Sequence, residues 1–158
     1  MNNLIRFVRL NYARADFILG YLKSPLLLAI RLYWGLELSM DGWAKLHNLD
    51  KVTDFFTTLN LPAPHMTAVF VSLVELVGGL LFALGLGTRL VALVLFINMT
   101  VAFLAAEKDA FLSVFSDPDK FQAASAYNDW FATLLITVLG PGALSVDSLF
   151  RRKTRTIK

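Results

Sequence analysis

Two long apolar runs limit this chain more than any other feature of its sequence. Residues 66–86 and 88–106 each contain a single charged side chain, Glu75 in the first run and Arg89 in the second. A helix that crosses a bilayer needs about 20 mostly apolar residues, and both runs have that length. In lipid the backbone must satisfy its own hydrogen bonds, which a helix does within one segment. The runs therefore predict an all-α integral membrane protein.

Two further segments can complete a membrane bundle. Residues 25–46 are mostly apolar and begin at Pro25, a residue suited to the first turn of a helix. Residues 123–140 form another such run, although Asn128 and Asp129 lie in its outer part. A hydrophobic content of 56% and a mean hydropathy of +0.59 are typical of membrane proteins rather than of soluble domains. The predicted membrane domain covers residues 25–143, with four spans at about 25–46, 66–86, 88–106 and 123–140.

Basic residues predict the orientation of this bundle, because cytoplasmic segments of membrane proteins are rich in Lys and Arg. Most of them lie in an N-terminal arm, residues 1–24, and in a tail, residues 144–158, while Arg89 lies at the connection between the spans 66–86 and 88–106. The connections on the opposite side mix lysines with acidic residues. We predict a multi-pass protein of the bacterial inner membrane with both termini in the cytoplasm. Because the basic residues lie at membrane boundaries, the bilayer is the expected partner and nucleic acid is not.

Two amphipathic segments predict short helices at the membrane surface. Within residues 4–19, Arg6 and Arg9 lie opposite apolar side chains, as in a helix that lies in the membrane plane. Residues 52–59 carry Val, Phe, Phe and Leu at positions i, i+3, i+4 and i+7, which is one face of a helix. Either segment could instead be a helix outside the membrane that packs on the bundle.

Glu75 needs a partner, because an ionised carboxylate in hydrocarbon is costly. The first span supplies four candidates: Arg31, Glu37, Asp41 and Lys45. Arg31 shares one face of its helix with Gly35, and Glu75 shares a face with Gly79, and small residues let neighbouring helices approach closely. We predict that Arg31 and Glu75 form a buried pair, in one network with Glu37, Asp41 and Asn98. Alternatively Glu37 and Glu75 lie at the same depth as a carboxyl pair, which cannot be fully ionised.

These buried polar residues allow several roles. They could only fix how the helices assemble, form a proton or ion path, or orient the headgroup of a lipid or of a quinone-like ring. The candidate catalytic residues are Glu75, Glu37 and Arg31. The candidate residues for binding a cofactor are Trp34, Tyr33, Asp41 and Asn98, the first two because aromatic side chains suit a ring ligand.

Histidine and cysteine content restricts the chemistry further. His47 and His65 are the only histidines and fall in or beside the same connection, so they are weak candidates for a metal site. The chain has no cysteine and cannot carry out thiol–disulfide chemistry or ligate an iron–sulfur cluster through its own thiols.

The chain resembles the DoxX family of small four-helix bacterial membrane proteins over about residues 30–147. The matching pieces, in order, are Arg31-x3-Gly35, Asp41-Gly42-x2-Lys45, Asn60-Leu-Pro62, Glu75-x2-Gly78-Gly79, Gly85-x-Gly87-Thr88-Arg89 and Gly140-Pro141-Gly142-x2-Ser145-x-Asp147. In the last piece the Gly-Pro-Gly sequence is expected to end the fourth helix, with Ser145 or Asp147 capping the segment after it.

The resemblance implies a redox-associated role. Members of the family are commonly labelled oxidoreductases, and a related group forms the small subunit of a thiosulfate:quinone oxidoreductase. It implies a quinone-linked membrane subunit that depends on a partner subunit or on a homo-oligomer, with quinone as the possible cofactor. The alternative is a role without catalysis, as a membrane scaffold, an assembly partner or a small proton-coupled carrier.

Overall fold

The structure of the protein is a computed structural model that describes residues 2–150, with only the backbone of residues 2–19. Within this range every regular element is a helix and no β-strand is present, which confirms the all-α prediction. The charged and apolar faces predicted for residues 4–19 belong to side chains outside the described part. Most of the basic tail, residues 151–158, also lies outside the described residues.

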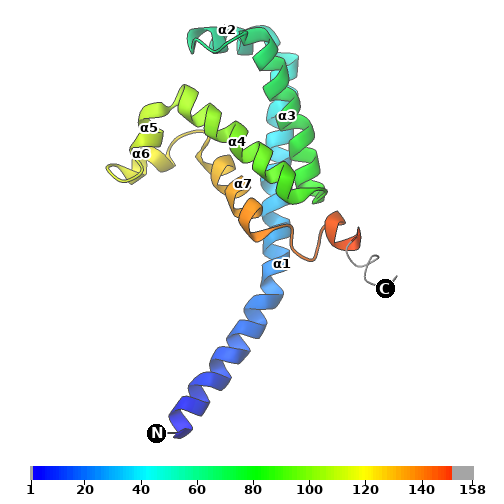
Figure 1. Ribbon diagram of the computed structural model, residues 1–158, viewed down its shortest axis with the longest axis vertical. Helices are drawn as coiled ribbons and strands as arrows, with labels where there is room; N and C mark the ends of the chain where they lie inside the picture. The colour runs from blue at the N-terminus through cyan, green and yellow to red at the C-terminus, as the bar shows by residue number, and fades with distance from the viewer. Residues whose placement is uncertain (1, 151–158) are drawn as a thin grey trace.

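In the described part of the chain, helices α1 to α7 form a bundle with one long arm, and residues 146–150 form a further helical segment (Figure 1). The labelled helices are α1 Asn2–His47, α2 Leu49–Thr58, α3 Pro64–Leu84, α4 Thr88–Ala106, α5 Lys108–Leu112, α6 Pro118–Gln122 and α7 Tyr127–Leu139. The first part of α1 extends out of the bundle (Figure 1). We call the end of the bundle that carries α2, α5 and α6 the loop end, and the end with the short connection between α3 and α4 the turn end.

Helix α1 continues through Pro25, so the predicted start of a helix at this residue is wrong. A proline within a helix removes one backbone hydrogen bond and normally bends or breaks the helix. Here Pro25 lies where α1 leaves the bundle, between the exposed Leu22 and the buried Leu27. The missing hydrogen bond therefore lies at the edge of the packed region. The backbone hydrogen bonds of the turns before and after Pro25 keep the helix continuous there.

Helices α3 and α4 are long and apolar enough to cross a membrane. Only 33% of the apolar window of α3 and 22% of that of α4 is buried inside the protein. A core helix of a soluble protein would be mostly buried, because apolar surface is driven out of water. The outward-facing apolar side chains of these two helices therefore indicate a membrane protein.

The number of spans stays a prediction. Helix α1 carries Arg31, Glu37, Asp41 and Lys45 within the predicted first span, which makes it less apolar than α3 and α4. Helix α7 has 13 residues, whereas 123–140 was the range expected. At 1.5 Å per residue, α7 is about 20 Å long, shorter than the hydrocarbon thickness of about 30 Å.

Small residues bring α1 and α3 into backbone contact, as predicted. A Cβ atom added to Gly35 would lie 2.8 Å from the carbonyl oxygen of Gly79, and one added to Gly79 would lie 2.6 Å from that of Gly35. Further along, a Cβ atom on Gly42 would lie 2.6 Å from the carbonyl oxygen of Ser72. Real Cβ atoms essentially never come within 3.0 Å of other atoms, so these positions admit only glycine in this packing.

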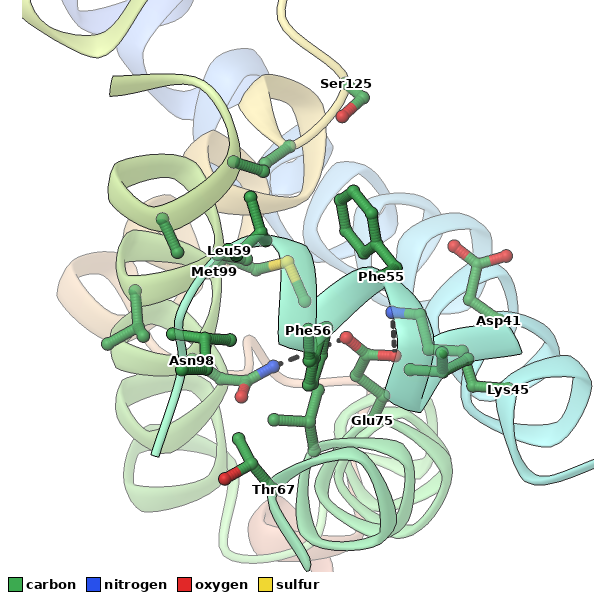
Figure 2. A pocket seen from close by; sticks show the side chains of 18 of the residues that line it. Asp41, Lys45, Phe55, Phe56, Leu59, Thr67, Glu75, Asn98, Met99 and Ser125 are labelled. Atoms are coloured by element: carbon green, nitrogen blue, oxygen red, sulfur yellow. Dashed lines mark hydrogen bonds and ion pairs between the residues drawn. The ribbon is translucent and has the colours of Figure 1, made fainter. Parts of the chain in front are cut away.

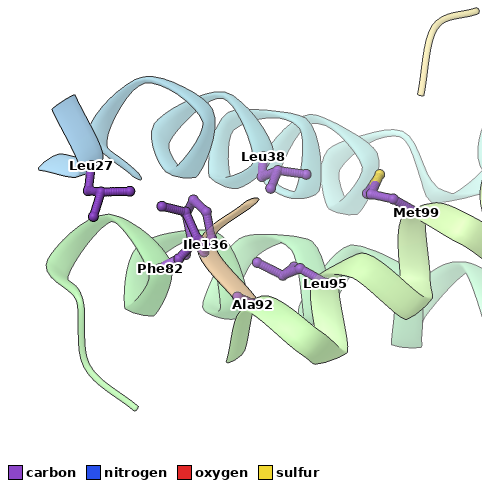
Figure 3. Close-up of a cluster of buried hydrophobic side chains, with 7 residues drawn as sticks. All are labelled: Leu27, Leu38, Phe82, Ala92, Leu95, Met99 and Ile136. Atoms are coloured by element: carbon purple, nitrogen blue, oxygen red, sulfur yellow. The ribbon is translucent and has the colours of Figure 1, made fainter. Parts of the chain in front are cut away.

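An apolar core joins the four longer helices of the bundle (Figure 3). Its buried members are Leu27 and Leu38 of α1, Phe82 of α3, Ala92, Leu95 and Met99 of α4, and Ile136 of α7. Gly78 of α3 lies against Leu95, whose Cδ2 would be 2.9 Å from an added Cβ atom. The two adjacent glycines therefore allow close packing against different helices, since Gly79 faces α1 and Gly78 faces α4.

An aromatic cluster fixes α5 and α6 to the loop end of the bundle. The rings of Phe103 in α4 and Phe121 in α6 stack with centroids 5.4 Å apart. Trp130 of α7 packs edge-on against both and donates from Nε1 to the Thr100 hydroxyl at 3.0 Å. This cluster determines where the chain enters α7, and hence where the polar residues of its first turn lie.

The segment after α7 folds back onto the turn end. Gly140 ends α7, and Ser145 Oγ accepts a hydrogen bond from the Ser148 amide at 3.2 Å, so both predictions for this segment are confirmed. Asp147 acts elsewhere: its carboxylate accepts from the amides of Gly87 and Thr88 at 2.8 Å each and from the Thr88 hydroxyl at 2.7 Å. It therefore caps α4, a helix that begins 59 residues earlier in the chain.

Replacing Asp147 with alanine is expected to lower the free energy of unfolding by about 1–2 kcal/mol, the usual value of a helix cap. The loss should appear as a lower melting temperature in mild detergent. Asp117→Ala is the matched control, because Asp117 caps the short exposed α6 through one 3.2 Å hydrogen bond. Equal losses in the two variants would contradict a special role for Asp147.

Candidate functional site

A cavity of about 550 Å³ lies at the loop end of the bundle (Figure 2). Helices α1, α2, α3, α4 and α7 all contribute to its wall. Its volume is in the range of small-molecule binding sites, about 300–1,000 Å³. Most of its lining surface is apolar, as is usual for such sites, although nine of the lining residues are charged or polar.

Helix α2 covers the cavity. The apolar side chains that the sequence placed on one helical face, Val52, Phe55, Phe56 and Leu59, all line it. No residue of α2 is fully buried, so the helix lies on the bundle as a cover and not within it. Met99 and Ala102 of α4 line the cavity as well. The amphipathic pattern predicted this helix, and the structure shows that its apolar face points into a cavity.

Three polar side chains meet at the wall between α1, α3 and α4 (Figure 2). The Lys45 ammonium forms an ion pair with Oε2 of Glu75. Asn98 Nδ2 donates to Oε1 of the same carboxylate at 3.4 Å. Glu75 is only 1% exposed, whereas the side chain of Lys45 is 35% exposed. We call Lys45, Glu75 and Asn98 the Glu75 group.

The predicted pair of Arg31 and Glu75 is wrong, because of the register of the two helices. Gly35 faces Gly79, and Gly42 faces Ser72, so α1 and α3 run in opposite directions. In this register Arg31 lies beside Gly85, ten residues beyond Glu75 along α3. Helical side chains lean toward the N-terminus of their helix, so the long side chain of Lys45 reaches back to the level of Glu75.

Arg31 instead belongs to the turn end. It is fully buried, and its Nη2 donates to the carbonyl oxygen of Leu144 in the segment after α7. Its guanidinium occupies the space where Gly85 lacks a side chain, and Gly85 has the left-handed φ of 73° that ends α3. Arg31 Nε and Nη1 have no hydrogen-bond partner in the described part of the chain. This residue ties α1, the α3–α4 turn and the C-terminal segment together.

A second acidic group lies beside the Glu75 group. Asp41 of α1 and Asp129 of α7 line the cavity, and Asp129 interacts electrostatically with the carboxylates of Glu37, Asp41 and Glu75. Asp129 Oδ1 is buried and has no hydrogen-bond partner among the described residues. In the sequence, Asp129 stands out only as a charged residue within the predicted fourth span. The signal was present, since an acid in an apolar run singled out Glu75 as well.

Three of the other candidate residues lie outside the cavity. Glu37 is half-buried on α1 and does not reach the lining, so Glu37 and Glu75 do not meet there as a carboxyl pair. Tyr33 is 66% exposed, and its ring packs edge-on against Trp34 with centroids 5.1 Å apart. Trp34 packs against the apolar core, and its Nε1 has no hydrogen-bond partner within residues 20–150. The aromatic side chains of the cavity are Phe55 and Phe56.

The two histidines also lie outside the cavity and have separate contacts. His47 Nδ1 lies 2.9 Å from the carbonyl oxygen of Trp43, and the two rings pack with centroids 4.3 Å apart. His65 Nδ1 lies 3.4 Å from the Thr53 hydroxyl. No group of three or more His, Asp or Glu side chains in the described part of the chain is arranged to hold a metal ion.

One hydrogen-bonded link closes the cavity beside α7. The Glu107 carboxylate, just after α4, accepts from the Ser125 amide at 3.0 Å and from its hydroxyl at 3.2 Å. Both residues line the cavity. Together, the candidates that the structure brings to this site are Glu75, Asp41 and Asn98, joined by Lys45, Asp129 and the cover formed by α2.

Comparison with known proteins gives one match. The DoxX family model matches residues 26–108. The matched region contains the packed part of α1 and all of α2, α3 and α4, and therefore the whole Glu75 group, while Asp129 lies beyond it. No curated protein and no solved structure matches the chain.

Proposed function

The chain belongs to the DoxX family, and from this premise we propose that it is a redox-associated membrane subunit whose cavity binds the ring of a quinone. The observation that carries the proposal is the position of the Glu75 group, with hydrogen-bond donors at the wall of a cavity whose surface is mostly apolar. A quinone has the complementary shape and polarity, since its flat apolar ring carries two carbonyl oxygens that accept hydrogen bonds.

The donors fit such a ring. The Lys45 ammonium has three N–H groups and uses one on Glu75, so others are available toward the cavity. The Asn98 amide is the second donor, and its hydrogen bond to Glu75 is long enough, at 3.4 Å, to be exchanged for a better one. Phe55 and Phe56 of α2, together with Met99, provide apolar surface against which a ring could pack.

The charged residues around the ring would supply protons to it and replace them from water. A quinone, when bound, supplies the chemistry of accepting electrons together with protons. Glu75 holds the Lys45 ammonium in position beside the cavity, and that ammonium can donate a proton from Nζ. Asp41 is exposed and lines the cavity near Lys45, so it could return a proton from water. Asp129, with an oxygen that no described residue satisfies, is the second group placed to do so.

The electrons would come from a partner subunit, since the chain has no cysteine with which to carry out thiol chemistry itself. We further propose the bacterial inner membrane as the location, with the turn end toward the cytoplasm and the cavity at the opposite surface. The basic residues of the N-terminal arm and the tail support this orientation.

Binding of a soluble short-chain benzoquinone to the purified protein in mild detergent tests the proposal. Asn98→Leu removes one donor while keeping a similar volume, and we expect it to weaken binding about tenfold, equivalent to one lost hydrogen bond. Tyr33→Leu is the control, because Tyr33 faces outward and lies away from the cavity. Equilibrium dialysis gives the dissociation constant of each variant.

The alternative roles predict a different result. A scaffold, an assembly partner or a carrier of another solute would show no measurable affinity for the quinone in the unmodified protein. Equal effects of Asn98→Leu and Tyr33→Leu would also contradict binding in this cavity. Purification of the unmodified protein with a stoichiometric partner but without any ring compound would favour the scaffold.

A further inference from the structure

The cavity lies in the space where α3 and α4 move apart. The two helices are joined by the short connection at Gly85–Gly87 and diverge toward the loop end (Figure 1). Both line the cavity in their outer halves, α3 through Thr67 and Val71 and α4 through residues such as Val101 and Ala102. One wall of the cavity is therefore formed by two helices that also present apolar faces to the membrane.

Val101 marks a place where the cavity meets the outer surface of α4. Its side chain lines the cavity and is also 55% exposed. Because Val101 lies on the apolar outer face of α4, its exposed surface fits a position at the rim of the cavity. Ala102 and Ala105 line the same side, and their small side chains leave space next to Val101. The part of the cavity rim between the outer halves of α3 and α4, at Val101, is called the side opening.

Polarity changes across the cavity. Asp41 and Lys45 come from α1, Glu75 of α3 lies beside them, and Asn98 lies on the opposite side, on α4 (Figure 2). On the side of Val101 the lining includes Val71, the alanines of α4 and the polar Thr67, with Asn98 before this part of α4 and Glu107 after it. A molecule with a polar head and an apolar chain would therefore be most stable with its head at the Glu75 group and its chain in the opening, because each part keeps a matching environment.

We infer that the ligand enters sideways from the half of the bilayer next to the loop end, through the side opening, and that it carries an apolar chain which remains between α3 and α4. The inference rests on the proposed function and adds the ligand class, an amphiphilic ring compound with a long hydrocarbon or isoprenoid chain. A water-soluble ring compound without a chain would leave the side opening empty.

Two quinones that differ only in the chain test this inference: a dimethoxy-methyl benzoquinone without a side chain and its decyl derivative. We expect the unmodified protein to bind the decyl form at least about tenfold more tightly, since burying two or more methylene groups is sufficient for that difference. Val101→Trp, which fills the side opening, should abolish this preference while changing the affinity for the chainless form less than about threefold.

Ile97→Trp is the matched control, because Ile97 is 53% exposed on the same helix, one turn away, and does not line the cavity. It should keep the preference for the decyl form. Val101→Gln, which adds polarity with little bulk, provides a second variant if the tryptophan prevents folding, and it should also reduce the preference. Melting temperatures of all variants verify that they are folded.

The outcomes separate the two proposals. Equal affinities for the two quinones in the unmodified protein would overturn the side opening while leaving the ring site intact. A preference that survives both Val101 variants, or one that Ile97→Trp abolishes equally, would also overturn it. Absence of binding of either quinone to the unmodified protein would reject the proposed function, and the inference with it.

Discussion

Replacing Gly42 with leucine is expected to prevent α1 from packing on α3 and to cause the largest loss of stability of any single substitution considered. A side chain at this position would overlap the backbone of Leu76 and approach the carbonyl oxygen of Ser72 to 2.6 Å. Backbone atoms cannot move aside as a flexible side chain can, so the two helices would have to separate. Overpacking costs about 1–3 kcal/mol and occasionally more, and we expect a value at or above the upper end.

Thermal unfolding in mild detergent, together with the yield of monodisperse protein, measures this effect. Gly20→Ala is the control, because Gly20 lies in the same helix with no atom within 4 Å of an added Cβ atom. It should be neutral or stabilise the protein by up to about 1 kcal/mol, since alanine favours the helix more than glycine does. A folded Gly42→Leu variant with an unchanged melting temperature would show that α1 and α3 do not pack in this register.

Replacing Lys45 with methionine is expected to lower the free energy of unfolding by about 3 kcal/mol, because it leaves the buried Glu75 carboxylate without its cation. Glu75 is 1% exposed, and Asn98 would be its only remaining hydrogen-bond partner among the described residues. The opposite change should cost less. In Glu75→Gln the ammonium of Lys45, whose side chain is 35% exposed, can turn toward water.

The double variant Lys45→Met with Glu75→Gln separates this explanation from a general loss of packing. Removing both charges should recover most of the stability lost in Lys45→Met, and the coupling between the two sites is measured by a double-mutant cycle. Arg31→Leu combined with Glu75→Gln is the comparison, and its losses should add because the two residues are not in contact. Additive losses for Lys45 and Glu75, or coupling between Arg31 and Glu75, would contradict the structure.

The local sequence determined the helices and their apolar faces. Apolar runs of sufficient length, with one charged residue each, predicted α3 and α4, and α4 has the predicted bounds, residues 88–106. The spacing of apolar residues predicted α2 and the face by which it covers the cavity. Glycines at 35 and 79 indicated the close approach of α1 and α3. Each of these properties depends on residues within a few helical turns of one another. The spacing of apolar and small residues along the sequence therefore predicts them directly.

The contacts of the charged residues were decided only by the tertiary structure. Several cations and acids of α1 were possible partners for Glu75, and the choice of Lys45 depends on the register of two antiparallel helices. That register is set by backbone contacts between residues far apart in the sequence, which no local pattern records. The same reason explains why Asp147 caps α4 and why Arg31 binds the segment after α7.

The cavity likewise arises from the arrangement of whole helices. The sequence by itself determined that Glu75 would be a buried acid in an apolar helix, because the run around it has no other charge. The sequence did not determine that Asp129 would lie in the same cavity as Glu75. The position of α7 depends on how the aromatic cluster packs α5 and α6 against α4. Apolar patterns specify which side of a helix is covered, and only the packing of that helix against distant ones decides which polar groups share a space.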